Sequence, residues 1–401
     1  MINFLLLAIS LSAFFSAQAA DIYVNNSGQA GTYTTITAAV AAASANDRIF
    51  VSPYAVYDEG VITITQNLTI ASAVSGTRFS YVGSFSITGA PNLEVRIIGA
   101  ELSNGIYTTT GTATLANKSH TYIIDCKANQ FSFLDFNVAH ILFSETNLVV
   151  NLEHGEVRGC NLHRISVNEG PNVGIGDTVF IVGNTIKTNI TWRNDDNYFY
   201  IANNNLTANK TTARSYRIII WEHLYNSNVN NMIINNSIAF NGTSSNPAAI
   251  KSGSINTSNL NNVWLVNNIL EEVSPTAGFV TYKDGSNTGD FQGYYNYHRG
   301  SISSFNNVVG NINIGASADT LSYDSFGRCT DAQVVDKGSP SLIYYDIDMT
   351  RNNLGTFGGP WSIDNYFSTA TGKARVYDLS IPFEIWSGQT PQVQAKSAHT
   401  K

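Results

Sequence analysis

A short pattern of apolar residues recurs along most of this chain, and it limits the possible folds more than any other feature. Each copy has an apolar residue, a second one two positions later, a slot residue three positions after that and a final apolar residue two positions beyond the slot. Successive slots are 20 to 39 residues apart. Apolar residues at period 2 predict strands with one inward face, and their recurrence predicts stacked coils with loops of variable length. The slot residues are Ala100, Phe136, Cys160, Asn184, Asn204, Asn236, Asn268 and Asn307.

The last five slots are all Asn, in a chain with 46 Asn among 401 residues. The slot falls at a bend, where an inward polar side chain needs a partner because burying an unpaired amide is costly. Amides stacked from coil to coil can supply that partner. We therefore predict a buried Asn ladder made of the five Asn slots, continued by Cys160 and Phe136. The alternative is coincidence, since an Asn-rich chain places this residue in many slots.

Composition excludes several classes of protein. Only 13% of the residues are charged, and the chain has 20 Tyr, 20 Phe and 5 Trp, more aromatic residues than a disordered chain carries. The net charge of -7 argues against a nucleic-acid partner, which requires clustered Lys and Arg. Three cysteines, Cys126, Cys160 and Cys329, fit buried free thiols or, alternatively, one disulfide and a leftover thiol.

The first 19 residues have the layout of a secretory signal peptide. Residues 4–11 form an apolar run, and Ala17-Gln18-Ala19 is a small-x-small cleavage site. No Lys or Arg precedes the run, so only the amino terminus supplies positive charge there. Beyond residue 19 no apolar stretch reaches the length of a membrane span. These features predict a protein that is secreted or held at the cell surface, without a transmembrane span.

The N-terminal end of the predicted stack has a candidate cap. A stack of coils exposes an apolar cross-section at each end, and covering it prevents edge-to-edge association. Thr34 or Thr35 can cap a short helix over residues 36–43, whose Ile36, Val40 and Ala43 share one face. This helix is followed by the predicted strand 48–51.

Over residues 21–360 the chain resembles the right-handed parallel β-helix, or pectin-lyase-like, superfamily. The residues that carry the resemblance are TYTTITAAVAAASANDRIFVSPY near the N-terminus and VVDKGSPSLIYYDIDMTRNNLGTFGGP at the far end. The second segment is similar to the terminal coil of secreted and cell-surface bacterial members, whose pattern is Asp-x-Asp-Gly-x-Arg-x-Asp-x-Gly. The positions that match are Asp346, Asp348, Arg351 and Gly355, and those that depart are Met349 and Asn353.

The resemblance implies a fold rather than an activity. It implies an all-β, single-stranded, right-handed parallel β-helix with an N-terminal helix cap. That fold hosts lyases, hydrolases, esterases and adhesins, so it does not by itself imply a reaction. We divide the chain into a signal peptide at 1–19, a β-helix domain at 20–366 and a C-terminal extension at 367–401.

The C-terminal extension has a different pattern from the coils. Residues 374–401 have the pattern of two strands that lack a sheet. They either fold back on the solenoid or begin a β-sandwich that this chain truncates, and we favour the second.

Strands between the slots carry the residues that we predict to bind a ligand. Trp192, Trp221, Lys251 and Tyr282 are separated by 29, 30 and 31 residues, close to the coil spacing. If these strands stack in register, the four side chains lie on one face, each about 4.8 Å from the next. Pyranose rings stack on aromatic rings, and sugar hydroxyls form directed hydrogen bonds. This face therefore predicts a secreted or surface-attached, adhesin-like and non-catalytic module that binds extracellular polysaccharide. The predicted substrate-binding residues are Trp192, Trp221, Glu222 and Lys283.

The alternative function is a polysaccharide lyase that acts by β-elimination on a glycan containing uronic acid. In that case Lys251 or Arg193 abstracts a proton beside the uronic carboxylate, and His223 or Tyr282 returns one to the leaving oxygen. A solvated face with two half-buried tryptophans is the third possibility.

No motif indicates a cofactor or a catalytic metal, and no feature indicates an oligomeric state. The alternating oxygen ligands at Asp346 and Asp348 are compatible with a structural calcium, although a plain turn is the default because the distal bidentate Glu is missing.

Overall fold

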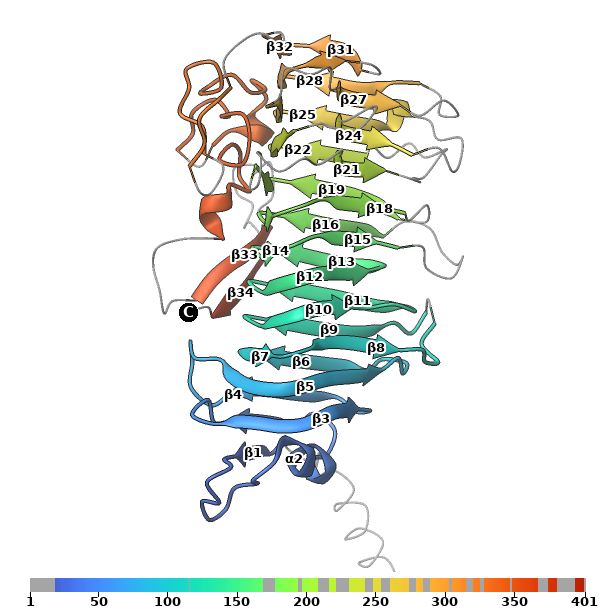
Figure 1. Ribbon diagram of the computed structural model, residues 1–401, viewed down its shortest axis with the longest axis vertical. Coiled ribbons are helices and arrows are strands. Elements are labelled where there is room, and N and C mark those ends of the chain that lie inside the picture. The colour runs from blue at the N-terminus through green and yellow to red at the C-terminus, as the bar shows by residue number, and fades with distance from the viewer. Residues whose placement is uncertain are drawn as a thin grey trace, which may run out of the picture.

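The computed structural model describes residues 19–399 except 115, 169–176, 194–196, 208–215, 221–230, 242–247, 254–259, 274–278, 284–288, 303–304, 315–319, 325–327, 347, 367–373 and 381–393. The architecture is all-β, with mostly parallel strands and very little helix. Successive turns of the chain stack into a long column of strands (Figure 1). This arrangement is compatible with the parallel β-solenoid that the repeat predicts.

One face of the column is a continuous 13-stranded sheet, which we call the first sheet. All of its strands are parallel to their neighbours, so each coil contributes one strand in the same direction. Its strands are β1 (Asp21–Val24), β2 (Arg48–Val51), β4 (Leu68–Ser72), β6 (Glu94–Ile98), β9 (Ser119–Ile124), β11 (Asn137–Leu142), β13 (His154–Arg158), β16 (Thr178–Val182), β19 (Tyr198–Ala202), β22 (Asn231–Ile234), β25 (Val263–Val266), β28 (Phe291–Tyr294) and β31 (Phe305–Val309).

The remaining strands of the coils form two further rows of parallel strands. The second sheet contains β7 (Ala100–Leu102), β14 (Asn161–Leu162), β17 (Thr185–Ile186), β20 (Asn205–Leu206), β23 (Ser237–Phe240), β26 (Ile269–Glu272), β29 (Tyr297–Arg299) and β32 (Ile312–Asn313). The third sheet contains β8 (Gly105–Thr109), β15 (Ile165–Val167), β18 (Ile190–Trp192), β21 (Tyr216–Ile220), β24 (Ala248–Ser252), β27 (Phe279–Lys283) and β30 (Ser301–Ile302). Four longer strands pair with or run along both rows: β3 (Val56–Ile64), β5 (Phe79–Thr88), β10 (Lys127–Ser132) and β12 (Glu145–Leu152).

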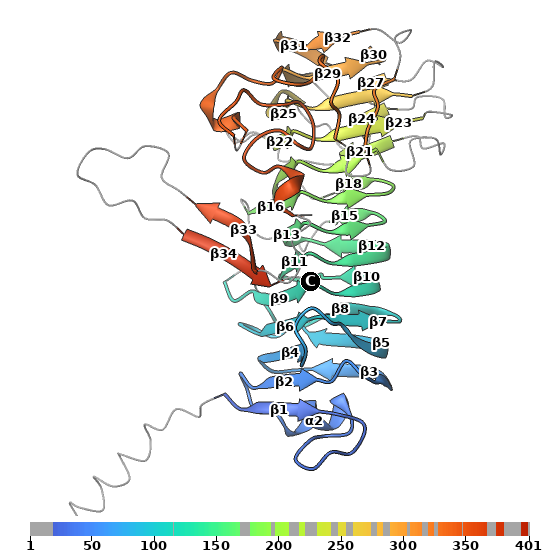
Figure 2. The ribbon, with the colours of Figure 1, turned by 90° about the vertical axis from the view of Figure 1, so that its left-hand side faces the viewer.

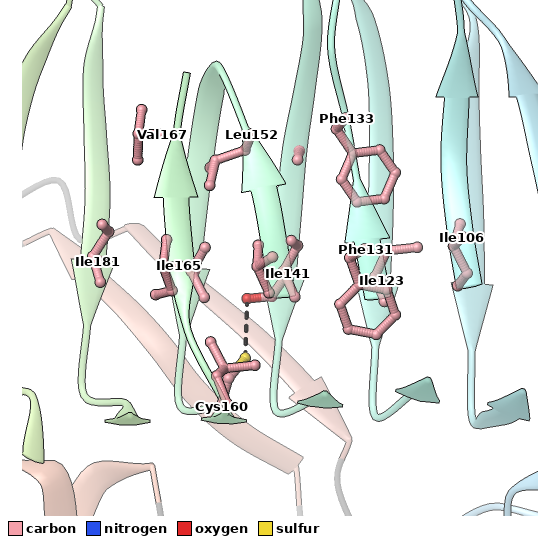
Figure 3. Close-up of a cluster of buried hydrophobic side chains, with 14 of the residues drawn as sticks. Ile106, Ile123, Phe131, Phe133, Ile141, Leu152, Cys160, Ile165, Val167 and Ile181 are labelled. Carbon is pink, nitrogen blue, oxygen red and sulfur yellow. Dashed lines mark hydrogen bonds between the residues drawn. The ribbon is translucent and has the colours of Figure 1, made fainter. Parts of the chain in front are cut away.

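The interior of the stack is one continuous hydrophobic core. Inward residues of the first sheet stack directly, as Ile123 pairs with Ile141 and Ile141 with Val157 in adjacent strands, and all three are fully buried. Phe131 and Phe133 fill the wider space toward the other sheets (Figure 3). Each such side chain stabilises the fold by about 1.5 to 3 kcal/mol on burial, so the stack is held mainly by this core.

A column of hydrogen-bonded asparagines runs through the bend between the first and second sheets. Each side-chain amide nitrogen donates to the next amide oxygen, at 2.9 Å from Asn184 to Asn204 and 3.0 Å from Asn204 to Asn236. Each amide oxygen also accepts the backbone N–H of the previous column residue, as Asn236 Oδ1 does from Asn204 N at 2.9 Å. The column continues through Asn268, Asn296 and Asn311. No water reaches these buried amides from Asn184 to Asn296, and their hydrogen bonds to one another satisfy them.

Smaller residues continue the column toward the N-terminus. The backbone N–H of Cys160 donates to Asn184 Oδ1 at 2.9 Å, and that of Ser144 donates to Cys160 Sγ at 3.3 Å. The backbone N–H of Cys126 donates to Ser144 Oγ at 3.1 Å. Cys126 and Cys160 are buried free thiols, and Cys329 is a free, partly exposed one.

The predicted slots at Phe136 and Asn307 are wrong. Ser144 holds the position that we assigned to Phe136, and Asn296 and Asn311 hold the positions that we assigned to Asn307. Asn307 lies within β31, opposite Gly293 and next to a shift of register. The template failed because Thr146, two positions after Ser144, is polar where the template requires an apolar residue.

The residue before each column position turns the chain through a positive φ. Gly, Asn and Asp reach this left-handed region at little cost, whereas other residues rarely adopt it. In an Asn-Asn pair, therefore, the first residue makes the turn and the second enters the column. Among the described residues the turning positions are Gly99, Asp125, Phe143, Gly159, Gly183, Asn203, Asn235, Asn267, Tyr295 and Gly310, with φ between 52° and 69°.

A seven-residue helix, α2 (Ile36–Ala42), lies at the N-terminal end of the stack (Figure 2). The hydroxyl of Thr35 accepts the backbone N–H of Ala38 at 3.2 Å and so caps the helix, as predicted. Ile36 and Ala39 are fully buried in the core beside β1 and β2. The helix ends one residue earlier than predicted.

The segment 334–366, which we call the flanking segment, lies beside the upper half of the stack (Figures 1 and 2). Its backbone carbonyls accept hydrogen bonds from the turning residues, from Asn203 to Thr356 at 3.0 Å and from Asn235 to Gly358 at 2.9 Å. It includes η2 (Leu342–Tyr344) and η3 (Ile363–Asn365); a third short turn, η1 (Leu260–Asn262), precedes β25. The predicted terminal coil is therefore wrong in its position, because this segment packs on the side of the coils.

The C-terminal extension contains two strands, β33 (Ala374–Ser380) and β34 (Gln394–His399), which pair with each other antiparallel. The domain boundaries themselves stay a prediction, and the predicted signal peptide at 1–19 lies almost entirely outside the described residues. Within the described part of the chain, no helix is long and apolar enough to cross a membrane.

Candidate functional site

The four strands predicted to form the binding face do stack on one another. They are β18, β21, β24 and β27 of the third sheet. Lys251 pairs with Tyr282 in the next coil, and its ammonium nitrogen lies 5.5 Å from the centre of that ring. Ile219 precedes Lys251 in the same column. Both Lys251 and Tyr282 are partly exposed, so part of the predicted face exists.

The prediction that Trp192 binds substrate is wrong, because its side chain is fully buried. Its ring packs edge-on against Phe199 at 5.1 Å in the core. Trp192 pairs with Ile220, the residue after Ile219, so it stands one position out of register with Lys251. Successive residues of a strand point to opposite faces, and a shift of one residue therefore turns the ring inward.

The other predicted face residues have different outcomes. Trp221, Glu222 and His223 lie outside the described residues. Arg193 is exposed and follows β18 directly. Lys283 donates to the Gly289 carbonyl at 2.8 Å and lies 3.3 Å from Asp290. Among the described residues the structure thus brings Lys251 and Tyr282 together, whereas Trp192 does not join them.

A denser group of charged and aromatic residues lies on the outer face of the first sheet. The register places Arg96, Tyr122, His140 and Glu156 in one column across four adjacent strands, β6 to β13. Neighbouring members are about 4.8 Å apart along the stack. We call this column, together with His120 and Arg158, the histidine cluster.

Aromatic and cationic groups stack in the middle of the histidine cluster. The rings of Tyr122 and His140 lie 4.3 Å apart and almost parallel, at 7°. The Arg96 guanidinium lies 4.7 Å from the centre of the Tyr122 ring, on the side of the preceding coil. Arg96 and its partner Glu94 are both largely exposed, so that ion pair contributes little stability.

Glu156 anchors the buried end of the cluster. Its carboxylate lies 2.8 Å from His140 Nδ1 and accepts a hydrogen bond from Arg158 Nε at 2.6 Å. Burial alone raises the pKa of Glu156, but His140 and Arg158 outweigh it and lower the pKa to about 2. Glu156 is therefore an anion that can only accept, which makes His140 Nδ1 the donor.

His120 extends the cluster toward the start of the strands. Its Nδ1 lies 3.4 Å from His140 Nε2, and the side chain is partly exposed. Burial lowers the pKa of His120, with further lowering by His140 and Lys118 and an opposing effect of Glu94. His120 is consequently a neutral imidazole at physiological pH.

A second group of ionisable residues borders the cluster at the start of the strands. Lys118 and Asp177 form an ion pair, and His154 Nδ1 lies 3.7 Å from Asp177. Burial, aided by Lys118, lowers the pKa of His154 to about 4. Burial raises the pKa of the neighbouring Glu153 carboxyl to about 7.

The flanking segment fixes Arg158. The guanidinium lies 5.2 Å from the centre of the Phe180 ring and 5.5 Å from that of Trp361. Phe180 belongs to β16, and Trp361 to the flanking segment. Arg158 is thus held between two rings while it binds Glu156, so the orientation of His140 depends on groups from three parts of the chain.

The sequence analysis missed the histidine cluster although a signal exists. Every repeat copy has an unconstrained position between its two apolar residues, and these positions form the outer column. Two copies, with slots Cys126 and Ser144, were not recognised because Thr121 and Thr146 stand at places where the template requires an apolar residue. These copies carry Tyr122 and His140 at the unconstrained position. Aligning the copies on the turning residue instead of the slot would have revealed the outer column.

Within the described residues, no group of three or more His, Cys, Asp or Glu side chains is placed to hold a metal ion. Asp346 and Asp348 line a pocket of about 520 Å³ in the flanking segment. The Asp346 carboxylate accepts backbone N–H groups of Asn353 and Gly359, and Asp348 accepts from Thr350. A structural calcium at these two residues stays a prediction.

Comparisons of the chain with protein-family models, with curated proteins and with solved structures find no match. The function is therefore argued from the geometry alone.

Proposed function

We propose that this chain binds an extracellular polysaccharide along the outer face of the first sheet, as a secreted or surface-attached module. The observation that carries the proposal is the stack of Arg96, Tyr122 and His140 on one exposed column of strands. Arg96 and His140 cover the two faces of the Tyr122 ring, so the column binds a sugar through directed hydrogen bonds from its charged and polar groups to the hydroxyls. A long regular face suits a long regular ligand.

The charges of the face also favour this ligand. Arg96 pairs with Glu94, and Lys118 with Asp177, so the open part of the face carries balanced charge rather than a single sign. Balanced, partly exposed pairs offer both donors and acceptors, which polysaccharide hydroxyls require. A face of this kind gives no advantage to nucleic acid, which needs an excess of Lys and Arg.

We also propose a fold class that is more specific than the all-β arrangement of parallel strands. We propose that the chain belongs to the right-handed parallel β-helix superfamily, with α2 as the cap of its first coil and the asparagine column as a ladder that fixes the register. The buried Ile36 and Ala39 beside β1 support the cap, and the amide hydrogen bonds from Asn184 to Asn311 support the ladder.

Affinity electrophoresis tests the proposal. The chain is run through native gels that contain one polysaccharide each, neutral or uronic, and its retardation is compared with that in a plain gel. We expect retardation by at least one polysaccharide, reduced by Tyr122→Ala or Arg96→Ala. Tyr282→Ala on the third sheet is the matched control and should migrate like the unaltered chain. Retardation by none of the polysaccharides contradicts the proposal.

The same gels, which compare Tyr122→Ala with Tyr282→Ala, also test the alternative binding site on the third sheet. A groove or lyase centre around Lys251, Tyr282 and Arg193 remains a proposal with one supporting contact, the approach of Lys251 to the Tyr282 ring. Loss of retardation in Tyr282→Ala, with Tyr122→Ala unaffected, would favour it.

A further inference from the structure

An apolar column runs along the outer face of the first sheet, two residues beyond the column of Arg96, Tyr122 and His140. Residues two positions apart in a strand point to the same face, so the two columns lie side by side. The register gives this apolar column one residue from each strand, namely Tyr23, Phe50, Ala71, Ile98, Ile124, Leu142, Arg158, Val182, Ala202, Ile234, Val266, Tyr294 and Val309. Among these residues Arg158 alone is charged.

The flanking segment covers the upper part of the apolar column. The column residues from Leu142 to Val266, apart from Arg158, are buried in one cluster with Tyr344, Trp361 and Tyr366. Apolar side chains on the outer face of a sheet are stable when another element covers them. The apolar column therefore already has one interface with a later segment of the same chain.

The lower part of the apolar column, toward the N-terminal end, is more exposed. The cluster of the flanking segment includes Ile124 but no column residue below it among those described. Ile98, Ile124 and Phe50 are partly exposed, and Tyr23 is 49% exposed. The rings of Tyr23 and Phe50 stack with their centres 5.6 Å apart. An exposed apolar strip of this kind is typical of a surface that another segment or molecule contacts.

The chain after Tyr366 is long enough and apolar enough to cover this lower part. Tyr366 ends the flanking segment near Phe143, with ring centres 6.5 Å apart, just after β11. Residues 367–373 can span up to about 25 Å when extended, whereas Ile98 in β6 lies two strands, about 10 Å, from β11. Seven of the eleven residues from 376 to 386 are Val, Leu, Ile, Phe, Tyr or Trp.

The C-terminal strands β33 and β34 form a sheet of their own with only two strands. A hairpin of two strands is marginally stable at best in water unless it packs on another element. Both views show β33 and β34 at the level of β9 to β13 (Figures 1 and 2). At this level the cover of the flanking segment ends and the exposed part of the apolar column begins.

We propose that the hairpin of β33 and β34 docks on the lower part of the apolar column, around Ile98 and Ile124, and continues the cover of the flanking segment. This is the first of the two arrangements that the sequence left open for the C-terminal extension. The docked hairpin stands beside Arg96 and Tyr122 and so competes with a polysaccharide for the histidine cluster. The docking is independent of the proposed function, whereas the competition rests on it.

Cross-linking of lysines in the full chain tests the docking. Lys127 lies three residues after Ile124, with its side chain 38% exposed, and Lys396 belongs to β34. We expect a short amine-reactive cross-linker to join Lys396 to Lys127 within one chain. Lys251, partly exposed on the third sheet, is the matched control and should not be joined to Lys396.

A double substitution tests whether the apolar column holds the hairpin. Ile98→Thr with Ile124→Thr keeps β-branched residues at two outward positions and replaces apolar surface by hydroxyls. The yield of the cross-link between Lys396 and Lys127 should fall at least about threefold. Val82→Thr, at a 41% exposed position of β5, is the matched control and should keep the full yield. A melting curve verifies that both variants are folded.

Trypsin measures the same docking without any substitution. A docked hairpin must open before it is cut, so cleavage after Arg375 should be at least about tenfold slower in the full chain than in a synthetic peptide of residues 367–401. Equal cleavage rates in the full chain and the peptide overturn the docking.

The cross-links and affinity gels separate the docking from the competition. A cross-link from Lys396 to Lys251 as strong as that to Lys127, or one that the double variant retains in full, overturns the docking. Cross-links between Lys396 and Lys127 of two different chains assign the surface to a second copy and also overturn it. A polysaccharide that retards the unaltered chain should retard the double variant more strongly than Val82→Thr. Equal retardation with the cross-link lost overturns the competition alone. If no polysaccharide retards any variant, the proposed function and the competition fail together, and the cross-link still decides the docking.

Discussion

The outer face of the first sheet has two halves that use the same strand positions differently. From β6 to β13 the outer column contains the charged and aromatic residues of the histidine cluster, which is partly exposed at Arg96 and buried at Glu156. From β16 to β25 the same column contains Phe180, Tyr200, Met232 and Trp264. The flanking segment packs on this second half, where Tyr344, Trp361 and Tyr366 join its apolar cluster.

The difference shows that equivalent outward positions of one sheet can either bury apolar side chains under a covering segment or carry charged groups. Apolar residues at outward positions need a cover, and the flanking segment supplies it over the upper coils. Its last residues also reach the ends of the first-half strands, where Trp361 and Phe180 hold Arg158 and Tyr366 packs near Phe143.

Removing the main anchor of the flanking segment should have the largest effect. Tyr366 is 2% exposed, and a Cβ on Gly183 would come within 2.2 Å of its ring. Tyr366→Ala should therefore cost about 3 to 5 kcal/mol of unfolding free energy, measured by urea denaturation. Tyr54→Ala, at an 82% exposed position, serves as the control. Equal midpoints for the two variants would show that the apolar half does not need its cover.

Breaking the asparagine column should have the next largest effect. Asn236→Leu keeps a similar volume but removes the oxygen that accepts from the Asn204 amide and backbone N–H, and one of the two donors to the Asn268 oxygen. We expect a loss of about 1 to 3 kcal/mol in unfolding free energy. Asn161→Leu, on an exposed position of β14, should change it little. A melting temperature of Asn236→Leu equal to that of the unaltered chain would contradict the structural role of the column.

The charged half should make stability depend on pH. The pKa of Glu153 is about 7 in the folded chain and about 4.5 when exposed. Its contribution is therefore complete below 4.5 and is lost as the pH rises through 7, because only the unfolded chain ionises in between. Glu153→Gln should be more stable than the unaltered chain at pH 8 by on the order of 1 to 2 kcal/mol, and equal to it at pH 4.

His154 changes the free energy of unfolding in the opposite direction as the pH rises, over an overlapping pH range. Its folded pKa of about 4 lies below its usual 6.5, so its contribution is complete above 6.5 and is lost as the pH falls through 4. Denaturation curves of the unaltered chain and of Glu153→Gln at several pH values test these signs. A difference between Glu153→Gln and the unaltered chain that is independent of pH would contradict the buried carboxyl.

The smallest effect should come from the third sheet. Lys251→Ala removes an exposed contact to Tyr282, so stability should change by less than about 0.5 kcal/mol, with retardation in polysaccharide gels unchanged. A clear loss of retardation would move the binding surface away from the first sheet.

The sequence predicted the parallel coils and the strands that stack, because apolar alternation and Asn slots report directly on the buried side. It did not predict the histidine cluster, since an outward position has no constraint on residue type and only the register brings Tyr122 and His140 together. The prediction that Trp192 binds substrate was wrong for a related reason. Coil spacing predicts which strands lie beside each other. A shift of one residue in register, however, decides whether a ring points inward or outward, and the variable loop lengths between coils prevent the exact register from being deduced from the sequence.

The most direct test of the account is chemical labelling of the histidines in the presence of polysaccharide. Diethyl pyrocarbonate modifies exposed imidazoles, and mass spectrometry measures the extent at each residue. We predict that a polysaccharide which retards the chain lowers the labelling of His120 and leaves that of His163, on another bend, unchanged. Equal labelling of His120 with and without that polysaccharide would contradict the claim that the outer face of the first sheet is the binding surface.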